Sequence, residues 1–363
     1  MEKQKVRIGF VGAGFMGQMA HLRNYVALPD CEVVALAEMR PRTGREVATR
    51  YGIPRLYANH AEMLAKEKLD GVVCAQPFDV HAALLPEIYG RVKNLFTEKP
   101  LAIGVEAGAR LAAEALQTGT VHMVGYHKRS DPATIYARHL IEQWKTSGEM
   151  GELRYVRITI PPGDWIGGGD FGHINMAEPM PPVVHEPPLT DLPGADAEKS
   201  VWQWEGPAGE YVRFINYYIH QVNYMRHMLD EPYRLVFADT RGVLLAVESA
   251  SGITGTIEMA PYRTTIDWQE NILVAFEKGY IRIHLPAPLV SNRAGVVEVL
   301  RDPGHGVTPE TIVPILPCVH AMRQQAAIFL KVCRGEIKPP CDAAEAVEDL
   351  KIARDYIRLW KGI

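Results

Sequence analysis

The stretch VRIGFVGAGFMG, residues 6–17, decides the fold of the first part of the chain. Its apolar first half is typical of a buried strand, and its second half is G-x-G-x-x-G at the start of a segment with helical periodicity. In such a turn Gly12 permits the sharp bend, Gly14 lets the backbone approach a pyrophosphate, and Gly17 permits close packing of helix on strand. The helix N-terminus then supplies free N–H groups for phosphates. The stretch therefore predicts a dinucleotide-binding turn.

A second apolar run, residues 32–37, ends at Glu38, about 20 residues beyond the last glycine of the fingerprint. An acid at this position accepts hydrogen bonds from the adenosine ribose and repels the extra phosphate of NADP, so NAD is the predicted cofactor and NADP is disfavoured. Arg40 and Arg42 lie close by and offset part of that repulsion. The alternative is a structural glycine turn beside an exposed acid. The other residues of the turn expected to contact the cofactor are Phe15 and Met16.

Strand-like and helix-like segments alternate through the first third of the chain, and the pattern changes after Gly125. Near-continuous apolar strands alternating with helices predict a doubly wound parallel sheet. Beyond it, β-rich segments separated by short turns predict a large, mostly antiparallel sheet, and two helices close the chain. The fold class is therefore α/β, with a Rossmann dinucleotide-binding domain at 1–125 and a substrate-binding and oligomerisation α+β domain at 126–363.

The composition is that of an ordinary globular protein. The chain has 363 residues, 47% of them hydrophobic and 23% charged, with a formal net charge of −4. No run approaches the roughly 20 apolar residues of a membrane span, and a mildly acidic chain has no general attraction for nucleic acid or membrane. The beginning lacks the apolar core of a signal peptide, and five scattered cysteines suggest reduced thiols, so a cytoplasmic location is expected. Thirteen histidines without a compact ligand pattern predict no metal site.

Lys99 follows the predicted strand at 94–97, at the carboxyl edge of the sheet, where ligands of open α/β sheets bind. A partly desolvated lysine beside a cationic ring has a lowered pKa, which suits proton transfer. Taken alone, however, Lys99 fits a surface lysine before Pro100 better than a catalytic residue.

Four motifs together resemble the family of glucose–fructose oxidoreductase and inositol dehydrogenase, known as Gfo/Idh/MocA. They are the glycine fingerprint, Gln76-Pro77 followed by His81, Glu98-Lys99-Pro100, and Gly125-Tyr126-His127-Lys128-Arg129. The resemblance runs through the whole chain and implies that Lys99 is catalytic. It also implies cofactor contacts from Gln76, Pro77, His81, Glu98 and Lys99, and a substrate boundary lined by His127 and Arg129. A solvated basic turn is the alternative for Lys128 and Arg129.

The family's second signature is an aspartate followed four residues later by a histidine that opens a helix. The matching residues are Asn216 and His220, with Tyr217 as a further substrate contact, so the resemblance implies that His220 relays a proton opposite Lys99. Asn216 is a departure, because an amide can bond a sugar hydroxyl but cannot act as a base. A competing match in the glycine run at 167–172 pairs Asp170 with His173 at a spacing of three, and His173 remains a substrate-pocket candidate.

The segment 161–209 is predicted to be a long irregular insertion. It carries nine of the 26 prolines and Trp165, Trp202 and Trp204. Such a segment tends to be a lid, an arm or a binding loop. Its tryptophans suit stacking on sugar rings or aromatic aglycones, with Trp165 a substrate contact, but an arm on a neighbouring subunit would bury them equally well.

Three functions are compatible with these residues. The leading one is an NAD-dependent oxidoreductase for a secondary ring hydroxyl of a sugar, a glycoside (C3 of a glucoside with an aromatic aglycone) or a cyclitol. The second is redox-neutral glycoside cleavage by oxidation, elimination and re-reduction, and the third is a non-catalytic dinucleotide-binding regulator. The expected partners are a small carbohydrate or glycoside and further copies of the chain, because the exposed sheet face needs cover.

Overall fold

The computed structural model describes residues 4–160, 163–167, 172–259 and 268–363, and the chain divides into two compact units. Unit 1 comprises Met1–Tyr126, Asp170–Asn216 and Gln325–Lys351. Unit 2 comprises His127–Gly169, Tyr217–Gln324 and Ile352–Ile363. The first boundary lies one residue from the expected one, but two later segments return to unit 1. The division is therefore not a single cut after residue 125.

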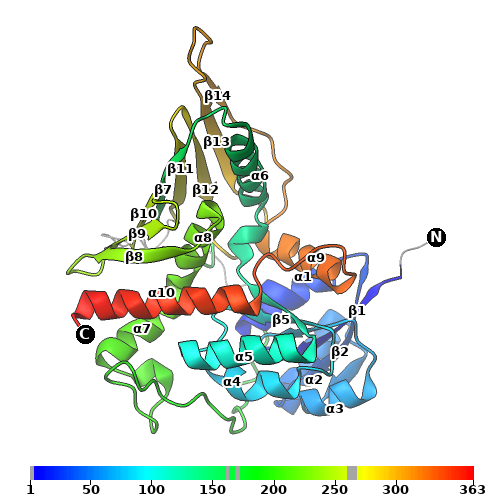
Figure 1. Cartoon of the computed structure of the whole chain (residues 1–363). Coiled ribbons are helices and arrows are strands. Elements are labelled where there is room, and N and C mark those ends of the chain that lie inside the picture. The colour runs from blue at the N-terminus through cyan, green and yellow to red at the C-terminus, as the bar shows by residue number, and fades with distance from the viewer. Residues whose placement is uncertain (1–3, 161–162, 168–171, 260–267) are drawn as a thin grey trace. The chain divides into compact units, whose positions relative to one another are not determined.

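Unit 1 is built on a six-stranded parallel sheet (Figure 1). The strand order is β3-β2-β1-β4-β5-β6, which reverses direction at β1. With right-handed crossovers, this order puts helices on both faces of the sheet, and buried strands of this kind are apolar throughout. The strands are β1 Val6–Val11, β2 Cys31–Ala37, β3 Arg55–Tyr57, β4 Gly71–Cys74, β5 Asn94–Glu98 and β6 Val121–Gly125.

The helices of unit 1 are interrupted by π-helical and 3-10 turns. The helix expected from residue 16 begins as a π-helical turn, η1 Gly17–Leu22, and continues as α1 Arg23–Tyr25. The later helices are α2 Pro41–Tyr51, α3 His60–Lys66, α4 His81–Leu84, α5 Val105–Thr118 and α7 Gly206–Tyr217, with short 3-10 turns η2 Phe78–Val80, η3 Leu85–Glu87 and η5 Val201–Gln203. The hydrophobic core of the unit contains side chains from the first piece, such as Phe10, and from the last piece, such as Phe329. The 325–351 piece therefore packs into the same core.

Unit 2 is built on an eight-stranded sheet with the order β14-β13-β12-β11-β7-β10-β9-β8. Every neighbouring pair is antiparallel except β7 and β10, which run parallel. Helices α6 Pro132–Ser147 and α8 Ile219–Leu229 pack against this sheet. The strands are β7 Leu153–Thr159, β8 Tyr233–Ala238, β9 Leu244–Ser249, β10 Thr254–Glu258, β11 Glu270–Phe276, β12 Gly279–Leu285, β13 Val296–Arg301 and β14 Glu310–Ile312.

Three further helical elements complete the chain. The turn η4 His127–Ser130 opens unit 2, and α9 Ala321–Cys333 and α10 Ala343–Lys361 each have residues in both units. Residues 206–229 form two consecutive helices, since α7 ends at Tyr217 and α8 begins at Ile219. Residues 161–162 and 168–171 of the expected insertion lie outside the described residues.

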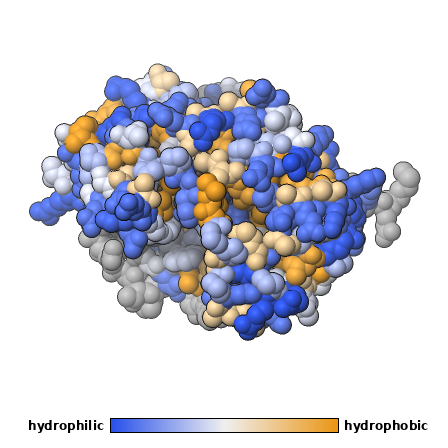
Figure 2. All heavy atoms as spheres, turned by 90° about the horizontal axis from the view of Figure 1, so that it is seen from below, coloured by the Kyte–Doolittle hydropathy of each residue, from blue (hydrophilic) through white to orange (hydrophobic). Residues whose placement is uncertain are grey.

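The surface shows where the apolar residues lie. On the face drawn in Figure 2, hydrophobic residues form small separate groups among hydrophilic ones. On the sheet of unit 2, polar side chains pair with each other across strands, as Arg282 does with Glu298 and Tyr155 with Thr256. Within the described residues, no helix combines the length and the apolar character that a membrane crossing requires.

Candidate active site

The glycine turn of unit 1 has the geometry that a pyrophosphate requires. Gly12 has φ +91°, and a Cβ there would lie 2.4 Å from Nε2 of Gln76. A Cβ on Gly17 would lie 3.0 Å from the Gly12 carbonyl oxygen, so helix and strand pack closely. A Cβ on Gly14 would meet nothing within 4 Å. The backbone therefore faces open space at the position where a dinucleotide phosphate would approach.

A cavity of ≈ 280 Å³ lies beside this turn, at the carboxyl ends of β1, β2 and β4. Ligand pockets are typically about 300–1,000 Å³, so this cavity suits one half of a dinucleotide. Its floor and walls include Val11, Glu38, Met39, Asn59, His60 and Gln76, and its other side is formed by Met180, Pro182, Val183 and Val184. The second group belongs to the segment predicted to be an insertion. The residues present therefore fit the adenosine half of a nicotinamide dinucleotide.

Glu38 is buried and is bonded on both carboxylate oxygens. The Arg40 side chain donates from Nε at 2.8 Å and from Nη2 at 3.0 Å, and the Ala13 N–H donates at 2.9 Å. Although burial opposes it, these hydrogen bonds hold the pKa of Glu38 below its ordinary value. Glu38 is therefore a carboxylate at neutral pH, and Arg40 is directed at it.

Residues 172–186 lie along unit 1 and are bonded to it at separate points. The Gln18 side chain donates to the Ile174 carbonyl and accepts from the Ile174 N–H, both at 2.8 Å. His185 pairs with Asp79 at 2.9 Å, and the buried Glu186 carboxylate accepts the N–H groups of residues 103 and 104 at 2.9 and 2.7 Å. The segment is therefore a strap across the cofactor side of its own unit, and we call residues 172–186 the strap.

His173 lies at the glycine turn. Its ring meets that of Phe15 edge to face, with centroids 5.0 Å apart. The sequence predicts a substrate-pocket histidine, whereas the described contact joins His173 to the dinucleotide fingerprint. Asp170, its partner in the competing motif match, lies outside the described residues.

Lys99 follows β5 at the carboxyl edge of the parallel sheet, as the sequence predicts. Its ammonium donates a hydrogen bond to the backbone carbonyl of Asn216. The adjacent Glu98 carboxylate lies 2.6 Å from Nε2 of the buried His21, on η1. The acceptor of the Lys99 hydrogen bond is the backbone carbonyl of residue 216. The contact therefore does not depend on whether this residue is an asparagine, as here, or an aspartate.

The other residues predicted at the cofactor differ in accessibility. Phe15, Met16 and Gln76 are partly exposed, and Pro77 precedes the turn η2. His81 is fully buried, and its Nδ1 lies 3.0 Å from the Leu101 carbonyl oxygen. Burial lowers the pKa of His81, so this imidazole is neutral and belongs to the core of the unit.

Unit 2 brings together two of the predicted histidines. The ring of His127, from η4, meets the ring of His220, from the first turn of α8, with centroids 4.9 Å apart at 75°. Tyr217 lies nearby in sequence, and its ring is 4.9 Å from Tyr218 and 6.3 Å from Trp268. The cluster combines imidazoles, which transfer protons, with aromatic rings, which suit a sugar face.

Lys128 and Arg129 do not form a solvated turn, and that alternative is wrong. Each is only 4% exposed. Lys128 forms a buried ion pair with Glu270, which also accepts a hydrogen bond from Gln221 at 2.6 Å. Arg129 donates from Nε to the Asn223 side chain at 2.6 Å. The pattern did not reveal this, because the partners stand about 95 to 140 residues further along the chain.

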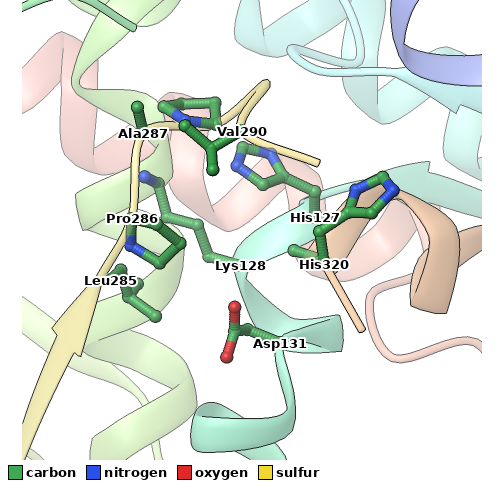
Figure 3. A pocket seen from close by; sticks show the side chains of 10 residues that line it. His127, Lys128, Asp131, Leu285, Pro286, Ala287, Val290 and His320 are labelled. Carbon is green, nitrogen blue, oxygen red and sulfur yellow. The ribbon is translucent and has the colours of Figure 1, made fainter. Parts of the chain in front are cut away.

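A small hollow lies beside this cluster (Figure 3). Its volume is ≈ 10 Å³, room for about one water molecule, and the labelled side chains include His127, Asp131 and His320. The Asp131 carboxylate accepts N–H groups of Ala133 and Gly295, and burial raises its pKa to about 6. The hollow is too small for a sugar. Asp131 instead caps the N-terminus of α6, where its side chain accepts the Ala133 N–H.

The three tryptophans of the expected insertion have different surroundings. Trp204 is buried and donates from Nε1 to the Asp196 carbonyl at 2.8 Å. Trp202 is 55% exposed and meets Phe78 edge to face, and both belong to unit 1. Trp165 is 37% exposed, belongs to unit 2, and its carbonyl accepts the Leu289 N–H. Within unit 1, therefore, Trp204 is a core residue and Trp202 presents an exposed ring.

Several residues of the candidate site escaped the sequence analysis. Gln18 and His21 follow the fingerprint directly. Their position in the helical segment after it is the sequence feature that could have identified them as site residues. Glu178 and the strap residues that line the cavity carry no motif. In the described ranges, no group of three or more histidine, cysteine or acidic side chains is arranged to hold a metal ion.

Comparison with known proteins agrees with this geometry. Residues 6–126 match the model of an oxidoreductase family with an NAD-binding Rossmann fold, GFO_IDH_MocA. Over these residues the chain is similar to the NAD-binding domain of that oxidoreductase family.

Named relatives match about half of this chain. Inositol 2-dehydrogenase of Rhizobium meliloti is 31% identical over 46% of this chain and 50% of its own. Levoglucosan dehydrogenase of Pseudarthrobacter phenanthrenivorans is 28% identical over 43% of this chain and 41% of its own. The chain thus spans about half the length of the curated relatives it matches. An oxidoreductase domain protein from Kribbella flavida shares the fold, with a TM-score of 0.72 at 18% identity, covering 99% of this chain and 98% of that one.

Proposed function

We propose that this chain transfers hydride between NAD and a secondary ring hydroxyl of a sugar, glycoside or cyclitol. The observation that carries the proposal is the position of Lys99, directly after β5 at the sheet edge that also bears the open backbone of Gly14 and the carboxylate of Glu38. Ligands of open α/β sheets bind at this edge. Relatives named for inositol and levoglucosan support a substrate with ring hydroxyls.

The protein's part in this reaction is to bind, orient and move a proton. The bound dinucleotide supplies the hydride acceptor. In our proposal the Lys99 side chain bonds the substrate hydroxyl, and Lys99, as the neutral amine, or the neutral imidazole of His220 takes up the hydroxyl proton when the ring carbon gives up its hydride, and returns it in the reverse direction; His127 orients the His220 ring. Glu98, bonded to His21, fixes the backbone that carries the lysine. Residues Arg129, Trp165, Asn216 and Tyr217 remain proposed substrate contacts.

A second candidate is redox-neutral cleavage of a glycoside. The strap over the adenosine cavity favours this reaction. A cofactor held beneath a hydrogen-bonded segment can be reduced and reoxidised within one turnover without leaving the protein. The substrate would be oxidised at C3, lose its aglycone by elimination across C1 and C2, and be reduced again. A base near C2 is required, and His173, Tyr217 or His185 is the candidate; in the structure His185 is paired with Asp79.

The test is Lys99→Ala in the full chain, assayed against sugars and aromatic glycosides. We expect turnover to fall at least about a hundredfold, because a proton-transfer group is lost, while NADH binding persists. The matched control is Lys93→Ala, which removes an exposed lysine at the opposite end of β5. Near-normal activity of the Lys99 variant would refute the mechanism. Recording nicotinamide reduction and product masses together separates an intact keto-sugar from a released aglycone.

A further inference from the structure

Helix α2 begins without a cap from its own neighbourhood. Its N-cap residue, Arg40, makes no capping side-chain bond, and Pro41 at the first position has no N–H. The first free N–H groups are those of Arg42 and Thr43. Both donate to the carboxylate of Glu178, at 3.1 and 2.8 Å, and the Thr43 hydroxyl donates to it at 3.1 Å. A strap residue 135 positions away therefore caps this helix.

The start of α2 is the place where a dinucleotide with a 2′-phosphate would carry its extra charge. Glu38 follows β2 directly and α2 begins at Pro41, so the ribose-binding acid and the helix N-terminus share one short turn. A ribose bound at Glu38 directs its 2′ substituent toward this turn. A helix N-terminus with free N–H groups is an anion site, and an arginine nearby accommodates the phosphate in NADP-binding folds.

Arg40, one of the two arginines at this turn, is already bonded to an acid. Arg40 donates to both oxygens of Glu38, through its backbone N–H and its guanidinium. The hydrogen bond to Glu38 and, more weakly, the charges of Glu38 and Glu178 raise the pKa of Arg40. The Arg40 guanidinium, which would otherwise face a phosphate, is thus bonded to Glu38 and lies in the field of Glu178.

Resting on the NAD-dependent function proposed above, we propose that Glu178 fills the position of the adenosine 2′-phosphate and so makes the chain select NAD over NADP. NADPH would have to displace the Glu178 carboxylate from its three hydrogen bonds, and its 2′-phosphate would then lie beside the Glu38 carboxylate. NADH has no 2′-phosphate, so its binding requires neither change. Specificity would then be set by the strap as well as by Glu38.

The strap holds Glu178 in place through bonds on both sides of it. Ile174 is fixed by the Gln18 side chain, and Glu186 by two backbone N–H groups at the start of α5. Between them, Met180 and residues 182–184 line the adenosine cavity. Removing one carboxylate therefore leaves the strap docked.

The experiment uses the whole chain in three forms: the original protein, Glu178→Ala and Glu178→Gln. For each form, the affinities for NADH, NADPH, ADP-ribose and 2′-phosphorylated ADP-ribose are measured. We expect NADPH and the 2′-phosphorylated probe to bind at least about tenfold tighter to Glu178→Ala than to the original protein, with NADH changed less than about threefold. Glu178→Gln should gain less, because it loses the charge but keeps the side chain. Glu198→Gln removes an exposed carboxylate of the same insertion and controls for net charge.

Each outcome distinguishes the two proposals. If the original protein binds neither dinucleotide, the proposed function fails. If it binds NADH but Glu178→Ala leaves the NADPH to NADH ratio unchanged, or weakens both equally, Glu178 is a structural cap only and the inference is overturned. An equal gain in Glu198→Gln would assign the effect to general charge and overturn it too.

Discussion

Lys128 and Glu270 form a buried ion pair in unit 2. Their side chains are 5% and 1% exposed, and the Lys128 ammonium lies 5.4 Å from the centre of the Trp268 ring. Taking two charges out of water is costly, so the pair is favourable only while both partners remain. The pair joins η4, which carries His127 and Lys128, to the start of β11.

Replacing Lys128 by Met leaves a buried carboxylate without its counter-charge. We expect the free energy of unfolding to fall by about 3–5 kcal/mol, measured by urea denaturation. The matched control is Lys66→Met, which breaks an exposed pair with Glu62 one helical turn away and should cost under about 1 kcal/mol. Equal effects of the two changes would contradict the burial of the Lys128 pair.

At the scale of elements, the strap is extended chain held by side chains instead of by a sheet. Most of its bonds are to helix starts or turns: Glu178 caps α2, and Glu186 accepts N–H groups at the start of α5. Helix N-termini have unsatisfied N–H groups, which attract carboxylates. Two carboxylates of the strap therefore dock at the starts of α2 and α5.

The docking of Glu186 should depend on pH. Burial raises the pKa of Glu186 from 4.5 to about 7, so the native chain holds this proton more tightly than the unfolded chain. The contribution of protonated Glu186 to the free energy of unfolding is fully present below about pH 4.5, and it is lost as the pH rises to about 7. The excess stability of the original protein over Glu186→Gln should therefore decrease from pH 5 to pH 8, by at most about 3 kcal/mol, in urea denaturation. A difference that is constant or grows with pH would refute this, and Glu198→Gln serves as the control.

At the scale of the whole molecule, unit 1 is assembled from three separate pieces of chain. The last piece contributes Phe329, which is fully buried, with ring centroids 5.7 Å from Phe96 and 6.4 Å from Tyr25. The cofactor-binding half is therefore completed by residues more than 300 positions from the fingerprint. A chain that ends at residue 126 lacks part of its own core.

Phe329→Ala tests this dependence. Removing a buried aromatic ring should lower the free energy of unfolding of unit 1 by about 3–5 kcal/mol. The loss should be seen as a lower urea midpoint of the NADH-binding signal. Phe237→Ala on β8, where the side chain is 49% exposed, should leave that midpoint nearly unchanged. An unchanged midpoint in the Phe329 variant would show that the last piece is dispensable.

The sequence by itself determined the Rossmann fold, the glycine turn, Glu38 and the edge position of Lys99. These features depend on local periodicity and on the rule that parallel strands end at one edge, so neighbouring residues encode them. The structure was needed to see that residues 172–186 of the expected insertion form a strap on the cofactor unit, that Glu178 caps α2, and that Lys128 is buried against Glu270. The physical reason is that these contacts join residues far apart in the chain, and their energies arise from packing and desolvation that no local pattern records.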